Sequence, residues 1–142
     1  MLLAVAAAVA FSAINTSAKS SGTTVSPPSA AEIAKLRVLA VAAAKGSGEA
    51  HPTDGVVVAT TRKQINRLNG GEEVDSNQDV YVIRLHGNFV AYWSSPPDGA
   101  SLPRGHMLLL VYDARTNALT DTMVGNYEIP VERLGTPQPL NP

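Results

Sequence analysis

The sequence of 142 residues contains no cysteine, and it has few aromatic residues (5%) and few charged ones (16%). Without cysteine there is no disulfide framework, no thiolate nucleophile, no lipid-modified cysteine and no zinc site built on thiolates. The 11 basic and 12 acidic side chains leave a formal charge of -1. Such a balance offers no electrostatic attraction to nucleic acid or to an anionic membrane, so we expect neither as a partner.

Apolar residues, in contrast, are plentiful and make up 44% of the chain. A chain of this composition buries enough apolar surface to fold, which excludes general disorder. Its length is that of one domain rather than two.

The first residues are typical of a targeting segment rather than of a part of the folded domain. Residues 2–14 form a nearly continuous apolar run, LLAVAAAVAFSAI. The run is shorter than the ~20 residues that span a bilayer, but it has the length of a signal-peptide core. Small residues at Thr16 and Ala18 suit a cut after Ala18. No Lys or Arg precedes the run, so an uncleaved anchor or an apolar helix packed on the domain stays open.

We therefore expect a secreted or envelope-attached, extracytoplasmic protein. Residues 1–18 are interpreted as a signal peptide or short membrane anchor, through which alone the chain would meet a membrane. Residues 19–29, KSSGTTVSPPS, have the composition of a flexible linker. Residues 30–134 form one domain, and 135–142 a proline-rich tail.

Two helices are predicted in the first half of the domain. Ser29 and Glu32 have the spacing of a capping box, and residues 30–45 continue without Gly or Pro until Gly46. A short strand at 56–59 then leads to a second helix at 61–69, for which Thr60 or Thr61 is a suitable N-cap.

Three strands are predicted in the second half, at 80–89, 106–113 and 119–124. The first shows a period of two, and the second is apolar on both faces. Residues 114–117 fit a hairpin loop, with Asp113 bonding the turn amides and Asn117 accepting a left-handed backbone. Residues 125–142 are predicted to be irregular. The fold class is α+β, with two helices packed on one face of a small antiparallel sheet of three to four strands.

The second helix, the strand VYVIRL and the hairpin LLLVYDARTNALTDTMV together resemble a PepSY-type domain over about 61–124. In that family a strand ends in D-A-x-T-G, where this chain has Asn117 in place of Gly. The stretch from His51 through Val74 to Gly135 is also similar to small exported actinobacterial proteins of unknown function. The resemblance implies an exported module, often one that inhibits or regulates extracellular enzymes.

An acidic loop before the first of these strands matches part of a calcium-binding pattern. Asp75, Asn77 and Asp79 supply oxygen ligands at alternate positions. The pattern then fails, because Val80 stands where Gly is needed and His86 where Glu is needed. We interpret the loop as a solvated turn.

The histidines and serines form no catalytic motif. There is no H-E-x-x-H and no G-x-S-x-G, and Ser47 lies in a flexible helix exit. His86 and His106 are on strands expected to be neighbours, so a shared site remains geometrically open.

A sheet might bring Asp98, Asp113 and Asp121 together for acid–base catalysis. Asp98 and Asp113 are better explained as turn residues, whereas the role of Asp121 stays open. We therefore predict a non-catalytic protein, with no catalytic residues, no metal site and no cofactor.

The feature most suggestive of binding is the aromatic pair Tyr92 and Trp93 beside a loop rich in proline. Arg84, His86 and Arg104 are expected to flank it, on the outward face of the 80–89 strand and at the loop's end. The leading hypothesis is an exported domain that binds a partner protein. Alternatives are a small-molecule or lipid binder with a pocket between the first helix and the sheet, and a hydrolase with an unrecognised site.

Overall fold

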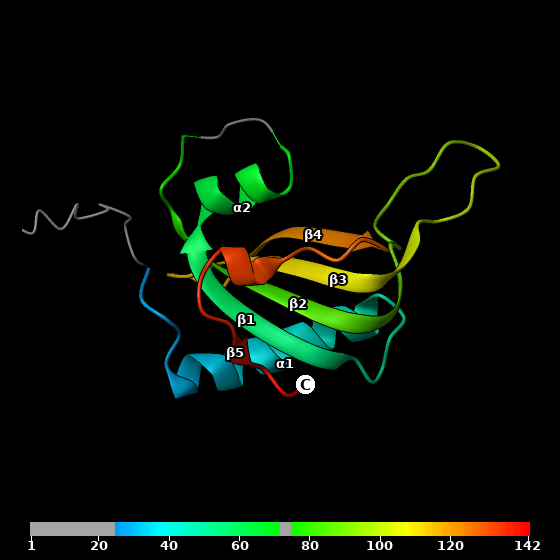
Figure 1. Ribbon diagram of the computed structural model, residues 1–142. Helices are drawn as coiled ribbons and strands as arrows, with labels where there is room; N and C mark the ends of the chain where they lie inside the picture. The colour runs from blue at the N-terminus through cyan, green and yellow to red at the C-terminus, as the bar shows by residue number, and fades with distance from the viewer. Residues whose placement is uncertain (1–24, 72–74) are drawn as a thin grey trace, which may run out of the picture.

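The computed structural model describes residues 25–71 and 75–142. The predicted signal segment 1–18 lies outside them, as do most residues of the predicted linker. The elements follow one another along the chain (Figure 1) as α1 (Ala30–Gly46), β1 (Thr53–Thr61), α2 (Arg62–Leu68), β2 (Asp79–Val90), β3 (Arg104–Asp113), β4 (Leu119–Gly125), a 3-10 turn η1 (Val131–Arg133) and β5 (Gln138–Pro139).

The strands form one antiparallel sheet in the order β4-β3-β2-β1-β5. The α+β class, the two helices and the antiparallel sheet are therefore confirmed. The sheet has five strands rather than three to four, because β5 joins at the edge of β1. Strand β1 is also longer than the predicted 56–59 and continues directly into α2.

Both helices begin where their capping residues predict. Ser29 accepts from the Glu32 amide while the Glu32 side chain accepts from the Ser29 amide. Thr61 caps α2 in the same way, with Gln64 as its reciprocal partner. Each pair satisfies amide groups that the first helical turn leaves without a partner.

One face of the sheet, the α1 face, packs against α1. The helix contributes Leu36, Ala40 and Ala44, all without exposed surface. The small alanines let the helix lie close to the strands. Against them pack side chains that alternate along the three central strands, namely Val57, Tyr81, Ile83, Leu85, Leu108, Leu110 and Tyr112.

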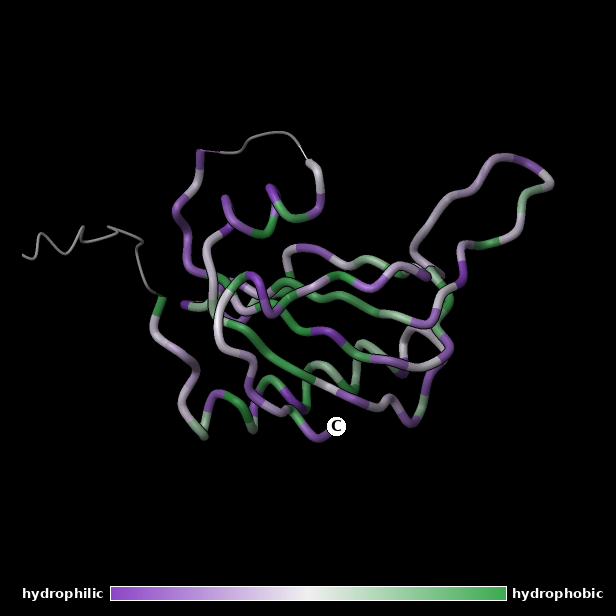
Figure 2. Tube along the Cα trace, in the orientation of Figure 1, coloured by the Kyte–Doolittle hydropathy of each residue, from purple (hydrophilic) through white to green (hydrophobic). Residues whose placement is uncertain are grey.

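The opposite face, the α2 face, is also covered, so the prediction that both helices share one face is wrong. Here Ile65 of α2 and Val131 of η1 pack on Val58, Val82 and other residues of the alternate set. Figure 1 shows α1 on one side of the sheet, with α2 and η1 on the other. In Figure 2 the central strands are largely hydrophobic, whereas the turns are hydrophilic.

The C-terminal residues complete the α1 face, although irregular structure was predicted for 125–142. Gln138 and Pro139 pair with Val57 and Val56 of β1. Leu140 is fully buried in the core under α1, and its carbonyl accepts a 2.6 Å hydrogen bond from Nε of Arg37. A pairing of two residues is too short to give a period in the sequence, which is why the pattern missed it.

The predicted hairpin turn is confirmed in detail. Oδ1 of Asp113 accepts from the amides of Arg115 at 2.8 Å and Thr116 at 3.0 Å. Asn117 has a φ of 55°, the left-handed conformation that asparagine tolerates. These bonds lower the pKa of Asp113, the Thr116 amide having the largest effect.

We expect Leu140→Ala to destabilise the fold by about 2–4 kcal/mol, because it opens a cavity beneath α1. The matched control is Leu119→Ala in β4, where the same atoms are removed from a side chain that is 47% exposed. Urea unfolding of both variants measures the difference. Equal, small losses would show that the C-terminal segment does not contribute to the core.

We also expect stability to fall in acid. The pKa values of Asp113, Glu32 and Glu49 are lowered, in each case mainly by bonds from backbone amides. A lowered pKa in the folded state means that the unfolded chain binds more protons. The contribution to stability is therefore complete above the ordinary carboxyl pKa, about 4, and is lost as the pH falls through and below it.

Urea midpoints measured from neutral pH into acid test this expectation. Asp113→Asn should lower the midpoint at neutral pH, and the gap from the original protein should close in acid. A gap of constant size at all pH values would contradict a contribution from the ionised carboxylate.

Candidate functional site

The five residues predicted to bind a partner occupy two separate places. Tyr92, Trp93 and Arg104 lie at the end of the sheet where β2 stops and β3 starts. Arg84 and His86 lie on the α2 face, since they pair in register with Leu109 and Met107. The outward face predicted for the 80–89 strand is therefore not open at Arg84, because the segment after β4 covers this side chain.

Backbone hydrogen bonds hold the base of the loop that carries Tyr92 and Trp93. The Val90 amide donates to the Ser47 carbonyl at 2.8 Å, which ties β2 to the end of α1. The next amide, of Ala91, donates to the Pro103 carbonyl at 2.9 Å and closes the loop 91–103. The loop then extends away from the sheet (Figure 1). Its aromatic residues therefore stand on a fixed platform.

The two aromatic side chains at this base are substantially exposed. Tyr92 is 58% exposed and Trp93 is 49% exposed. The ring of Tyr92 lies over Gly48, where a β-carbon would be 3.3 Å from the phenol oxygen. Gly48 has a φ of 86°, which a side chain would oppose. The absence of a side chain at Gly48 thus leaves room for the hydroxyl end of the tyrosine ring.

A third exposed aromatic residue, Tyr127, follows β4 at the same end of the sheet and is 88% exposed. The chains are close there: a side chain on Gly105 would collide with the Gly125 backbone, and the His106 amide donates to Asn126 at 3.2 Å. Tyr127 was not among the predicted binding residues, because its own segment does not indicate that the end of β4 lies beside the start of β3. We call Tyr92, Trp93, Tyr127 and the loop 91–103 the aromatic end.

A pocket of about 270 Å³ opens at this end of the sheet. Buried Phe89 contributes to its lining, and polar side chains complete it. Arg104, one of the predicted binding residues, is exposed and is among them. The other polar residues are Asn88, His106 and Asn126.

Arg84 belongs to a cluster of ion pairs that holds the C-terminal segment on the α2 face. Its guanidinium lies 2.9 Å from Glu128 and 2.8 Å from Glu132, and it donates to the Ile129 carbonyl at 3.0 Å. Only 11% of the Arg84 side chain is exposed. The pKa of Glu132 is lowered, first by its own backbone amide and then by Arg84. Arg84 is therefore a structural anchor.

His86 lies beside this cluster, between two carboxylates. Its Nε2 is 3.0 Å from Glu128, and its Nδ1 is 3.9 Å from Asp54. Asp54 has a φ of 49° at the irregularity in β1 between Thr53 and Val56. Neither carboxylate was identified from the sequence, because Asp54 lies at the irregular start of β1 and Glu128 lies after β4, and neither position belongs to a periodic pattern.

Other combinations that the sequence left open are not brought together. His86 pairs with Met107, so the neighbouring His106 belongs to the opposite face of the sheet. Asp113 lies at the opposite end of the sheet from the loop that carries Asp98. Asp121 forms an ion pair with Arg62.

The acidic loop that resembles part of a calcium site supports α2 instead. The carbonyls of Ser76 and Gln78 accept from the amides of Lys63 and Arg62, and Asp75 pairs with Lys63 at 3.1 Å. Within residues 25–71 and 75–142, no group of three or more His, Asp or Glu side chains is arranged to hold a metal ion.

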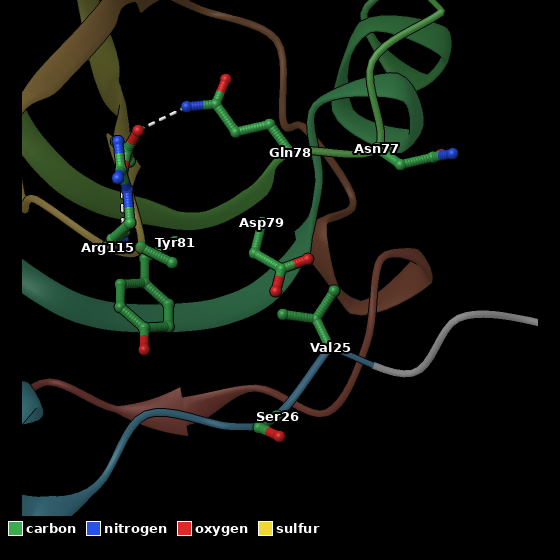
Figure 3. A pocket seen from close by; sticks show the side chains of 9 residues that line it. Val25, Ser26, Asn77, Gln78, Asp79, Tyr81 and Arg115 are labelled. Carbon is green, nitrogen blue, oxygen red and sulfur yellow. Dashed lines mark hydrogen bonds between the residues drawn. The ribbon is translucent and has the colours of Figure 1, made fainter.

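A polar pocket of about 510 Å³ lies at the end of the sheet opposite the aromatic end. Figure 3 shows it between residues 25–26 and the start of β2. Tyr81 donates to Glu32 at 3.2 Å, and Gln78 donates to Asp113. Burial and the nearby Glu32 carboxylate raise the pKa of Tyr81, which keeps its hydroxyl protonated. The first bond joins β2 to α1, and the second joins the segment before β2 to the hairpin.

The predicted ligand space between α1 and the sheet is filled by side chains, because the inner residues of α1 are completely buried. A pocket of about 240 Å³ lies instead between α2 and the strands β3 and β4. Its floor is apolar, with Ile65, Leu109 and Val111. Ligand pockets usually measure ~300–1,000 Å³, so this one is small.

No family model, no curated protein and no solved structure matches the chain. The resemblance to PepSY-type domains and to exported actinobacterial proteins therefore stays a prediction. In the part of the chain that the structure describes, no helix is long and apolar enough to cross a membrane.

We expect Arg84→Met to destabilise the protein by about 1–2 kcal/mol, because it removes hydrogen bonds to the C-terminal segment while the freed carboxylates stay partly hydrated. The control is Arg104→Met, at an exposed position. Urea unfolding should separate the two variants. Equal stability of both would contradict the anchoring role.

Proposed function

We propose that this chain is a non-catalytic exported domain that binds a partner protein outside the cytoplasm through its aromatic end. The observation that carries the proposal is the placement of aromatic residues. Tyr92, Trp93 and Tyr127 are the exposed ones among the described residues, and all three are at one end of the sheet.

Tyrosine and tryptophan are the residues that contribute most to binding at protein interfaces, because each buries a large rigid surface and keeps a polar group for a hydrogen bond. In this chain Tyr92 and Trp93 follow a base held by the Val90–Ser47 and Ala91–Pro103 bonds. A platform of this kind loses little conformational entropy when a partner binds.

The surroundings of His86 favour binding over hydrolysis. A general base needs one ring nitrogen directed at the substrate or at a nucleophile. Here Nε2 is bonded to Glu128, and Nδ1 is buried and faces Asp54. Both nitrogens are thus directed at carboxylates, an arrangement that suits an anchor for the segment after β4.

The export part of the proposal is supported by the leader pattern of residues 2–14. Fractionation of cells that produce the full-length chain tests it. We expect the protein in the envelope or the medium. Finding the chain only in the cytoplasm would contradict this part without affecting the binding surface.

The binding surface is tested with a photo-cross-linking residue placed at position 93 in producing cells, with position 38 as control. Val38 is 69% exposed but lies on the outer side of α1. We expect a discrete adduct from position 93 alone, from which the partner is identified. Adducts of the same pattern from both positions would contradict the proposed surface.

With that partner purified, Tyr92→Ala and Trp93→Ala should each weaken binding by about tenfold or more, as for aromatic residues at the centre of an interface. Val38→Ala serves as the matched control. Calorimetric titration measures the change. Unchanged affinity in both aromatic variants would overturn the proposal.

A further inference from the structure

We infer that two copies of this chain pair through strand β4 and form one continuous sheet across a two-fold axis. This inference concerns a different surface from the aromatic end and does not depend on it. Three observations support it. The two sheet edges are protected to different degrees, β4 pairs with β3 in regular register, and two antiparallel copies of β4 place no like charges opposite each other.

The two edges of the sheet are protected to different degrees. Strand β5 closes one edge with only two paired residues, one of them Pro139, and proline offers no amide to another strand. Strand β4 closes the other with seven residues, LTDTMVG, which include neither Lys nor Pro. Among the described strands, its only neighbour is β3. Its outer backbone groups are therefore available to an added strand.

The part of β4 that suits an added strand is its second half. An irregularity in the β3–β4 pairing falls between Val111 and Tyr112 and so distorts the start of β4. From Asp121 to Gly125 each residue pairs in unbroken register with β3. The regular stretch therefore has five residues, and Met123 is at its centre.

An antiparallel pair of these stretches, centred on Met123, brings complementary residues together. Met123 faces its own copy, Thr122 faces Val124, and Asp121 faces Gly125, which has no side chain. No two like charges are opposite each other, which would be destabilising. The Asp121 carboxylate is already paired with Arg62 of its own chain.

The side chain at the centre of such a pair is exposed and apolar. Met123 is 37% exposed, and it lines the small pocket between α2 and the sheet. Two methionines from the two copies would meet on the α2 face, beside that pocket. The formal charge of -1 on the whole chain also leaves almost no net repulsion between the copies. A second copy is thus the partner that this edge fits.

The first test measures the mass of the protein, expressed from its full-length coding sequence and purified, by light scattering over a concentration series. We expect the mass of two chains, falling towards that of one chain on dilution. Met123→Lys should give the mass of one chain, because it places a positive charge opposite its copy on the edge. A matched variant, Val38→Lys, should keep the mass of two chains.

Met123→Lys must also keep the circular dichroism spectrum of the original protein, so that loss of the dimer is not loss of the fold. A single-chain mass for the original protein at its highest soluble concentration would overturn the inference. A two-chain mass that Met123→Lys leaves unchanged would overturn it as well, because the copies would then meet elsewhere.

The second test uses the absence of native cysteine. Met123→Cys should form an intermolecular disulfide under mild oxidation, because a residue on the two-fold axis faces its own copy within reach of such a bond. Val38→Cys is the exposed control and should form little. Equal cross-linking of the two variants would indicate random collision and would contradict the proposed register.

Discussion

The fold depends on one constraint, which is that the middle strands of the sheet are apolar on both faces. Val82 and Ile83 of β2 are neighbours in sequence, point to opposite sides and are both fully buried. A sheet of this kind must be covered twice. The chain meets the need with α1 on one side and with α2 and η1 on the other, and the ion pairs of Arg84 hold the segment around η1 in place.

Local signals made much of this fold predictable. The capping residues located both helices: Ser29 for the first, and Thr60 or Thr61 for the second, of which the structure uses Thr61. The turn chemistry of Asp113 and Asn117 located the hairpin. These features act within a few residues, so the sequence alone contains them. The prediction that both helices lie on one face was wrong because the second buried face was not recognised in the sequence. The even-numbered positions of β2 begin with apolar valines, but Arg84 interrupts this apolar series.

The candidate site was predictable only in part, for a related reason. Tyr92 and Trp93 are visible in the sequence as an adjacent aromatic pair, and both are exposed as expected. Tyr127 joins them only because β4 ends beside β3, a relation that no local pattern encodes. Arg84 and His86 were expected at an open surface, but segments distant in sequence supply their acidic partners and cover Arg84. Long-range charge pairing of this kind has no periodicity to detect.

The bond between Arg37 and Leu140 has a consequence for how the chain acquires its structure. These residues are 103 positions apart. Contacts of such long sequence separation slow folding. The inner side of α1 cannot be completely buried until residue 140 has been synthesised, and it therefore stays partly uncovered in the nascent chain up to that point.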